Sequence, residues 1–125
     1  MGSIAVGERN KILDAFARNV AYQNAAIWVK LHTADPGAAG TTAPAANTTR
    51  VLGTFGTGAS AGAISNTTLT EWTNVPTAET YTHVSLWSAS TAGTFLGSDD
   101  LSAPAAVAVG DTFQLPIGQI SVTLA

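Results

Sequence analysis

The sequence predicts a mainly β protein: an N-terminal α-helix followed by an antiparallel, jelly-roll-like β-sandwich of about seven or eight short strands. Three observations support this fold class. Helical spacing of apolar residues is confined to the start of the chain, period-two alternation recurs after it, and Gly, Pro and Asn clusters separate the alternating runs. We therefore expect one structural domain, in which residues 1–24 form an arm and helix and residues 25–125 form the β-sandwich.

The composition bounds the possible functions of this 125-residue chain, whose length fits a single core. Only 10% of the residues are charged, against about 25% in an average globular protein, and a surface of that kind suits a chain packed against neighbours. The net charge of −3 with five basic residues argues against direct nucleic-acid binding. The absence of cysteine excludes disulfides and thiolate chemistry. No apolar run is long enough for a membrane span, and no signal-peptide pattern opens the chain.

The first 24 residues are predicted to form an arm and a helix. Residues 1–7 are small and apolar, which indicates an extended arm or strand that could also lie against a neighbouring subunit. From about Gly7 to residues 21–24 the spacing becomes helical, with Asn24 as a candidate C-terminal stop. One apolar stripe is expected to be buried because an isolated helix of this length is marginal: Ile12, Leu13, Phe16 and Val20. Asp14 and Arg18 are spaced for an ion pair on another face.

The strongest strand signal follows directly. In residues 27–33 the apolar positions Ile27, Val29 and Leu31 alternate with Trp28, Lys30 and His32, the pattern of a strand with two different faces. The run breaks at residues 35–37 (Asp-Pro-Gly) because proline fixes φ and glycine supplies a free φ after it. Residues 34–49 then form a long loop of small side chains, and loops of this length are often functional or lie in contacts.

The remaining chain reads as short strands joined by turns. In residues 81–89 Tyr81, His83 and Trp87 are predicted to share one face, with Trp87 at least partly buried. Turns are expected at 90–93 and 110–111 because these positions carry the residues that turns prefer. The further strands are expected at 50–55, 66–72, 94–97, 107–109, 112–115 and 117–124.

One segment matches a catalytic motif. Residues 58–62 read Gly-Ala-Ser-Ala-Gly, the G-x-S-x-G pattern of serine hydrolases. That mechanism needs a strand before the serine, a helix after it, and Asp then His later in the chain. Here Ser60 lies in a glycine-rich loop followed by strand-like sequence. We therefore predict no catalytic residues and no enzyme activity.

The titratable residues do not predict a metal or cofactor site. His32 and His83 could be neighbours, but a zinc site needs three or four ligands and no third His or Cys exists. We expect two half-buried histidines beside Trp28 and Trp87 instead. Asp99, Asp100 and Asp111 lack the spacing of a calcium loop, and we expect solvated carboxylates in turns.

Two further patterns admit a binding or modification role. Trp28, Trp72 and Trp87 could form a platform on which sugars stack, although in a core with few large residues they are more simply its bulky anchors. Asn47 and Asn66 begin glycosylation sequons. Without a signal-peptide pattern we interpret both as ordinary polar residues of loops and strands.

Several segments carry a family resemblance. They are residues 29–37 (VKLHTADPG), Arg50, 82–87 (THVSLW), 93–97 (GTFLG), 110–113 (GDTF) and 118–124 (GQISVTL). In this order, after an N-terminal helix, they resemble a family of small virion proteins from tailed bacteriophages, described as minor tail or other structural proteins. The loop at 38–44 departs from the family pattern, in which an acidic residue and more glycines occur.

The resemblance implies a non-enzymatic virion structural protein with no cofactor. Our first reading is a capsid decoration (cement) protein whose partner is the major capsid protein. The alternative is a minor tail or fibre protein bound to tail proteins, or a carbohydrate- or host-receptor-binding module. We expect a homotrimer, in which residues 2–6 could add a strand to a neighbour's exposed sheet edge.

Overall fold

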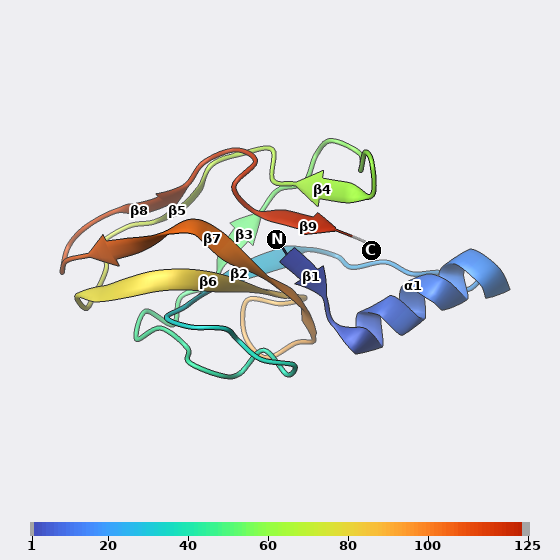
Figure 1. Ribbon diagram of the computed structural model, residues 1–125, viewed down its shortest axis with the longest axis horizontal. Helices are drawn as coiled ribbons and strands as arrows, with labels where there is room; N and C mark the ends of the chain where they lie inside the picture. Colours follow the sequence, from blue (N-terminus) through green and yellow to red (C-terminus); the bar gives the residue numbers. More distant parts are fainter. Residues whose placement is uncertain (1, 124–125) are drawn as a thin grey trace.

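The computed structural model describes residues 2–123 and shows a mainly β protein with one helix near its N-terminus (Figure 1). The fold class predicted from the sequence is confirmed. The helix is α1 (Val6–Arg18). The strands of the described chain are β1 (Gly2–Ile4), β2 (Ile27–His32), β3 (Val51–Gly53), β4 (Ala63–Ser65), β5 (Thr70–Trp72), β6 (Glu79–Trp87), β7 (Phe95–Val107), β8 (Phe113–Leu115) and β9 (Ser121–Thr123).

Most strands belong to one curled sheet in the order β3-β2-β6-β7-β1-β9-β4, while β5 and β8 form a separate two-stranded ribbon. Neighbouring strands are antiparallel, except that β1 and β9 run parallel. The β2–β6 pair sets Trp28 opposite Trp87 and His32 opposite His83. The period-two alternation predicted for β2 therefore fixes which side chains share each face of the sheet.

The N-terminal arm is an internal strand of this chain's own sheet. β1 lies between β7 and β9, with Ser3 opposite both Ser98 and Thr123. Strands β1 and β7 approach so closely that a Cβ added at Gly97 would overlap the backbone of Ser3. The small residues at the start of the chain thus permit a close strand contact within the molecule.

The hydrophobic core joins the sheet to the ribbon. Val29 and Leu31 of β2 are fully buried, and the ring centroids of Tyr81 and Phe113 lie 5.1 Å apart. The alternation predicted that Tyr81 would share the His83 face, but Tyr81 belongs to the hydrophobic core. The β6–β7 register shifts between Tyr81 and His83, and such irregularities bend and twist strands, so strict alternation does not extend across this point.

The predictions for the helix need correction. Helix α1 ends at Arg18, where Asn19 adopts a left-handed φ of 57° and its N–H donates to the carbonyl oxygen of Asp14; Asn24 is not the stop. The predicted apolar stripe is not buried, since Phe16 is 88% exposed. The reason is visible in Figure 1, where α1 projects beyond the edge of the sheet. The predicted Asp14–Arg18 ion pair is present at 3.5 Å.

Several strand boundaries also differ from the prediction. Asp99 and Asp100 lie within β7 and not in a turn, because β7 continues as one strand to Val107 and takes up part of the segment expected at 107–109. The strands expected at 50–55, 66–72 and 117–124 are shorter than predicted, and residue 124 lies outside the described residues. The strand β4 was not predicted. It forms because a tight turn at residues 60–63 returns the chain to pair with β9.

Candidate functional site

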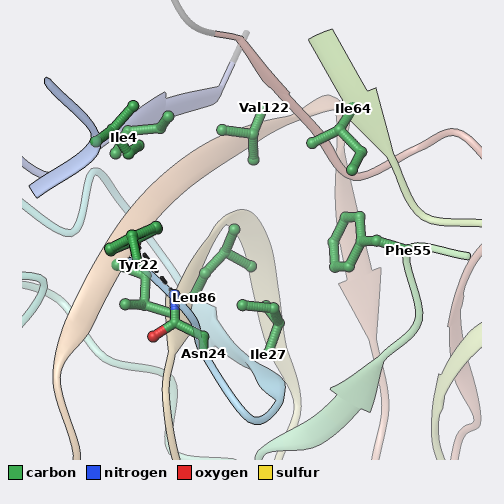
Figure 2. Close-up of a pocket in the computed structure, with 10 residues that line it drawn as sticks. Ile4, Tyr22, Asn24, Ile27, Phe55, Ile64, Leu86 and Val122 are labelled. Carbon is green, nitrogen blue, oxygen red and sulfur yellow. Dashed lines mark hydrogen bonds between the residues drawn. The ribbon is translucent and has the colours of Figure 1, made fainter. Parts of the chain in front are cut away.

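The candidate site is an apolar cavity of about 250 Å³, partly open to solvent, between the sheet and the segment that follows α1. Figure 2 shows aliphatic side chains and the Phe55 ring arranged around it. Eight separate stretches of the chain supply the lining, which is almost wholly apolar. Its residues are Ile4, Ile12, Tyr22, Asn24, Ile27, Phe55, Ile64, Leu86, Leu96 and Val122.

A group of hydrogen bonds closes one side of this cavity. The Tyr22 hydroxyl donates to Glu8 Oε1 at 2.9 Å and accepts from Asn24 Nδ2 at 3.1 Å. Lys11 Nζ lies 2.9 Å from Glu8 Oε2. Glu8 is therefore buried yet paired on both carboxylate oxygens, as a buried charge must be. Burial, together with the bond to Glu8, raises the pKa of the Tyr22 hydroxyl.

The cavity is suited to packing and not to catalysis. Its polar side chains are Tyr22 and Asn24, and they already bond to each other. A catalytic centre would need a nucleophile or base aimed at a reacting group, and the lining described here supplies neither. The cavity volume lies just below the usual range of small-molecule sites.

The opposite face of β2 and β6 carries a buried hydrogen-bond chain. Trp87 Nε1 donates to Ser85 Oγ at 2.7 Å, Ser85 Oγ lies 2.7 Å from His32 Nε2, and His32 Nδ1 lies 2.9 Å from the Thr42 carbonyl oxygen. Because a carbonyl only accepts, Nδ1 carries the proton and Nε2 accepts from Ser85. Burial lowers the pKa of His32. His32 and Ser85 are both fully buried, so this Ser–His pair is structural.

The long loop at residues 34–49 covers that face. Its Thr42 carbonyl holds His32, and Gly40 lies so close to Phe95 that a Cβ there would overlap the ring. At the start of the loop the Gly37 N–H donates to Asp35 Oδ1 at 2.9 Å. This contact is the turn that the Asp-Pro-Gly sequence predicts.

Trp72 and Trp87 serve as packing anchors, so the three tryptophans do not form one exposed platform. Trp72 and Trp87 are buried and both indole N–H groups are bonded, Trp72 to the Thr49 carbonyl oxygen at 2.9 Å. The Arg50 guanidinium lies 4.4 Å from the Trp87 ring centroid and donates to two carbonyl groups of the turn after β6. Trp28 is half-buried on the same sheet face as Trp87.

The serine motif does not form a nucleophile elbow. Ser60 and Ala63 exchange two backbone hydrogen bonds of 2.9 and 3.0 Å across a turn in which Ala61 and Gly62 both have positive φ. Strand β4, and not a helix, follows this turn. The strand–serine–helix geometry that activates such a serine is therefore missing.

The two histidines are adjacent, and Asp100 lies opposite His83 across the β6–β7 pair. His32 and His83 are cross-strand partners, and His32 is more deeply buried than expected. Asp99 is buried, where its Oδ2 accepts from the Ser121 N–H at 2.8 Å and burial raises its pKa. Asp111 caps the turn at 108–111 by accepting from the Ala108 N–H. Within residues 2–123 no group of three or more His, Cys, Asp or Glu side chains has the arrangement of a metal site.

Both sequon asparagines are buried, so they are structural residues. Asn66 donates to the carbonyl oxygens of Thr68 and Pro116 and accepts from the Ile120 N–H. Asn47 is buried and its Oδ1 accepts from the Thr49 N–H. This agrees with their reading as ordinary polar residues.

The cavity was missed at the sequence level. Ile4, Ile64 and Phe55 lie in short segments with no strong periodicity, and only long-range pairing of β1, β9 and β4 brings them together. The usable signals were the alternation of the strand that contains Ile27 and the predicted helix stripe, one of whose residues, Ile12, lines the cavity.

The fold is that of a small β-rich protein, and the apolar cavity is its candidate site. Residues 4–123 match the protein family described as podophage GP4 fiber I protein gp80, and the chain belongs to this family. A search of curated proteins finds no sequence similar to the chain. The helix of the described chain is too short and too polar to cross a membrane.

Proposed function

We propose that the chain is a non-enzymatic structural protein of a tailed-bacteriophage virion and forms part of a fibre attached to the tail. The observation that carries this proposal is the family match, which extends over residues 4–123. It favours the minor tail or fibre alternative over the capsid-decoration reading that the sequence first suggested. The partners in this proposal are tail proteins and further copies of the chain.

The surface of the molecule supports an assembly role. Few charges cover it, the cavity presents an apolar wall to the exterior, and α1 carries exposed large apolar side chains. Contiguous exposed apolar surface in a soluble protein commonly marks an interaction site. The receptor-binding reading is weakened because two of its three tryptophans, Trp72 and Trp87, are buried in packing.

The proposal is tested by separating the tails of purified virions from their capsids and quantifying the chain in each fraction by mass spectrometry. We expect the chain to be enriched with the tails, while the major capsid protein, as the internal control, remains with the capsids. Enrichment in tail-free capsids, in fixed ratio to the major capsid protein, would support decoration and overturn the fibre proposal.

A further inference from the structure

Two basic side chains lie next to each other on the sheet without an acidic partner. Val29 of β2 pairs with Val51 of β3, so the next position of this antiparallel pair brings Lys30 alongside Arg50. Neither side chain forms an ion pair with any residue of the described range 2–123. Like charges that face each other across two strands destabilise a sheet. Such a pair is unexpected in a chain with five basic residues and a net charge of −3.

The Arg50 guanidinium is held in one orientation. Its plane lies over the Trp87 ring, with 4.4 Å to the ring centroid, and Nη1 donates to the carbonyl oxygens of Ala89 and Ala92 at 2.9 and 2.7 Å. These two bonds use both protons of Nη1, while the protons of Nε and Nη2 have no acceptor among residues 2–123. The Nε–Nη2 edge is a planar fork that matches two oxygen atoms of one anion. Arg50 therefore presents a fixed and unused donor edge.

The Lys30 ammonium is also without a partner. Lys30 follows Trp28 by two positions and so shares the sheet face of Trp28, Trp87 and the stacked Arg50. Its side chain is half-buried, and its Nζ donates to no group of the described chain. Burial, and then the charge of Arg50, lowers the pKa of Lys30. Because charges that are withdrawn from water are normally paired, an anion from outside the chain is the missing partner.

We propose that Lys30 and Arg50 form a binding site for a phosphate group. The free edge of Arg50 donates to two phosphate oxygens, and the Lys30 ammonium donates to a third. A phosphate monoester carries about −1.5 to −2 charges at pH 7, which balances the two positive charges. Bound phosphate replaces the repulsion between the cations by their attraction to a shared anion. A carboxylate fits less well, because its single charge leaves one cation unbalanced.

The site does not depend on the assignment of the chain to a tail fibre, because the contacts of Lys30 and Arg50 define it. Two sources share the required chemistry: free phosphate and a phosphate ester on a sugar. The net negative charge of the chain disfavours the phosphates of a nucleic acid, which bind strongly basic surfaces.

The first test is a titration of the isotope-labelled full chain with inorganic phosphate, followed by NMR of the backbone amides at constant pH and ionic strength. We expect saturable shifts that are confined to residues 28–31, 49–51 and 87–92, the segments around the two cations. Glucose phosphate and glucose are titrated in the same way. Glucose should not bind. Glucose phosphate should bind at the same residues, and tighter binding than that of inorganic phosphate would assign a sugar ester as the ligand.

The second test compares variants. Lys30→Gln should weaken phosphate binding about tenfold, the value of one hydrogen bond to a charged group. Arg50→Lys keeps the charge but loses the fork, and it should weaken binding by a similar factor. Arg18→Gln is the matched control. It removes the same charge from the end of α1, where Arg18 forms an exposed ion pair with Asp14, and it should bind phosphate as wild type does.

Thermal unfolding without phosphate tests the premise that Lys30 has no partner within the chain. Lys30→Gln should unfold at a temperature no lower than wild type, because the substitution removes a contact between like charges. A lower melting temperature would show that Lys30 is already paired and would overturn the inference. The same holds for an absence of saturable shifts, for a Lys30→Gln variant with wild-type affinity, for an equal loss in Arg18→Gln, and for glucuronate binding more tightly than phosphate.

Discussion

At the scale of single residues, the clearest structural device is the buried chain from Trp87 through Ser85 and His32 to Thr42. Each group in it has one permitted role, since an indole N–H only donates and a carbonyl only accepts. The arrangement requires a neutral His32 with its proton on Nδ1. Burial is the main cause that lowers the pKa of His32. The nearby Lys30 and His83 lower it further because they disfavour a charged ring.

This histidine should make stability depend on pH. The folded-state pKa of His32 lies below its unfolded value of about 6.5, so its contribution is complete above that pH and is lost as the pH falls from about 6.5 towards the lowered pKa. Within that window the free energy of unfolding should fall by up to about 1.4 kcal/mol per pH unit. Urea unfolding at a series of pH values from 8 to about 5 measures this slope.

The matched variants isolate the histidine responsible. His32→Gln removes the titrating group and should flatten the slope, whereas His83→Gln should retain it. The raised pKa of Asp99 contributes with the opposite sign at more acidic pH, and it cancels in the comparison of variants. Equal slopes in wild type and His32→Gln would contradict the assignment.

Ser85 should matter as much to the stability of the fold as the His32 ring that it contacts. Ser85→Ala leaves both the Trp87 indole N–H and His32 Nε2 without a partner in a buried site, and we expect a loss of about 1–3 kcal/mol in the free energy of unfolding. Ser60→Ala, at an exposed turn, should change it by less than about 0.5 kcal/mol. A loss at Ser85 no larger than at Ser60 would show that the hydrogen-bond chain adds nothing to stability.

At the scale of elements, the packing of β1 between β7 and β9 depends on glycine. A methyl group at Gly97 would overlap the backbone of Ser3, so Gly97→Ala should cost about 1–3 kcal/mol, the usual range for overpacking. Gly58→Ala is the control because nothing lies within 4 Å of the added Cβ. Thermal unfolding of both variants compares them. Equal melting temperatures for Gly97→Ala and Gly58→Ala would mean that β1 can move away from Gly97 without loss of stability.

Helix α1 is held by polar contacts and not by its apolar stripe. Phe16→Ala, measured where the chain is monomeric, should change the free energy of unfolding by less than about 0.5 kcal/mol. Tyr22→Phe should cost about 1–2 kcal/mol, because it removes a hydrogen bond to the buried Glu8 carboxylate. The reverse order of the two losses would show that Phe16 is packed within its own chain.

The sequence predicted the strands with long alternating runs well, but it did not predict how the helix would be placed. β2 and β6 carry long alternating runs, and period alone predicted the two faces of β2 and the face that His83 shares with Trp87, but not the position of Tyr81. The His32–His83 contact was only a possibility at that level. The helical spacing in α1 was equally plain, but spacing does not say which surface receives a stripe. Here Tyr22, beyond the helix, binds Glu8 and turns the stripe outward.

At the scale of the whole molecule, the fold class followed from the sequence and the candidate site did not. The cavity needs β1 to pair in parallel with β9 at the far end of the chain, a contact between short strands without strong periodicity. The face of β2 and β6 that carries His32 is covered because the loop at residues 34–49 folds back over it. Both are long-range contacts, which local pattern does not encode.

The central claim is that this protein belongs to a fibre on the phage tail. The most direct measurement is electron microscopy of virions in which the exposed turn at residues 108–111, at the far end of β7 from α1, carries an epitope bound by a gold-labelled antibody. The account predicts gold on fibres at the tail and unlabelled capsid shells. Gold distributed over the capsid surface, with bare tails, would contradict it.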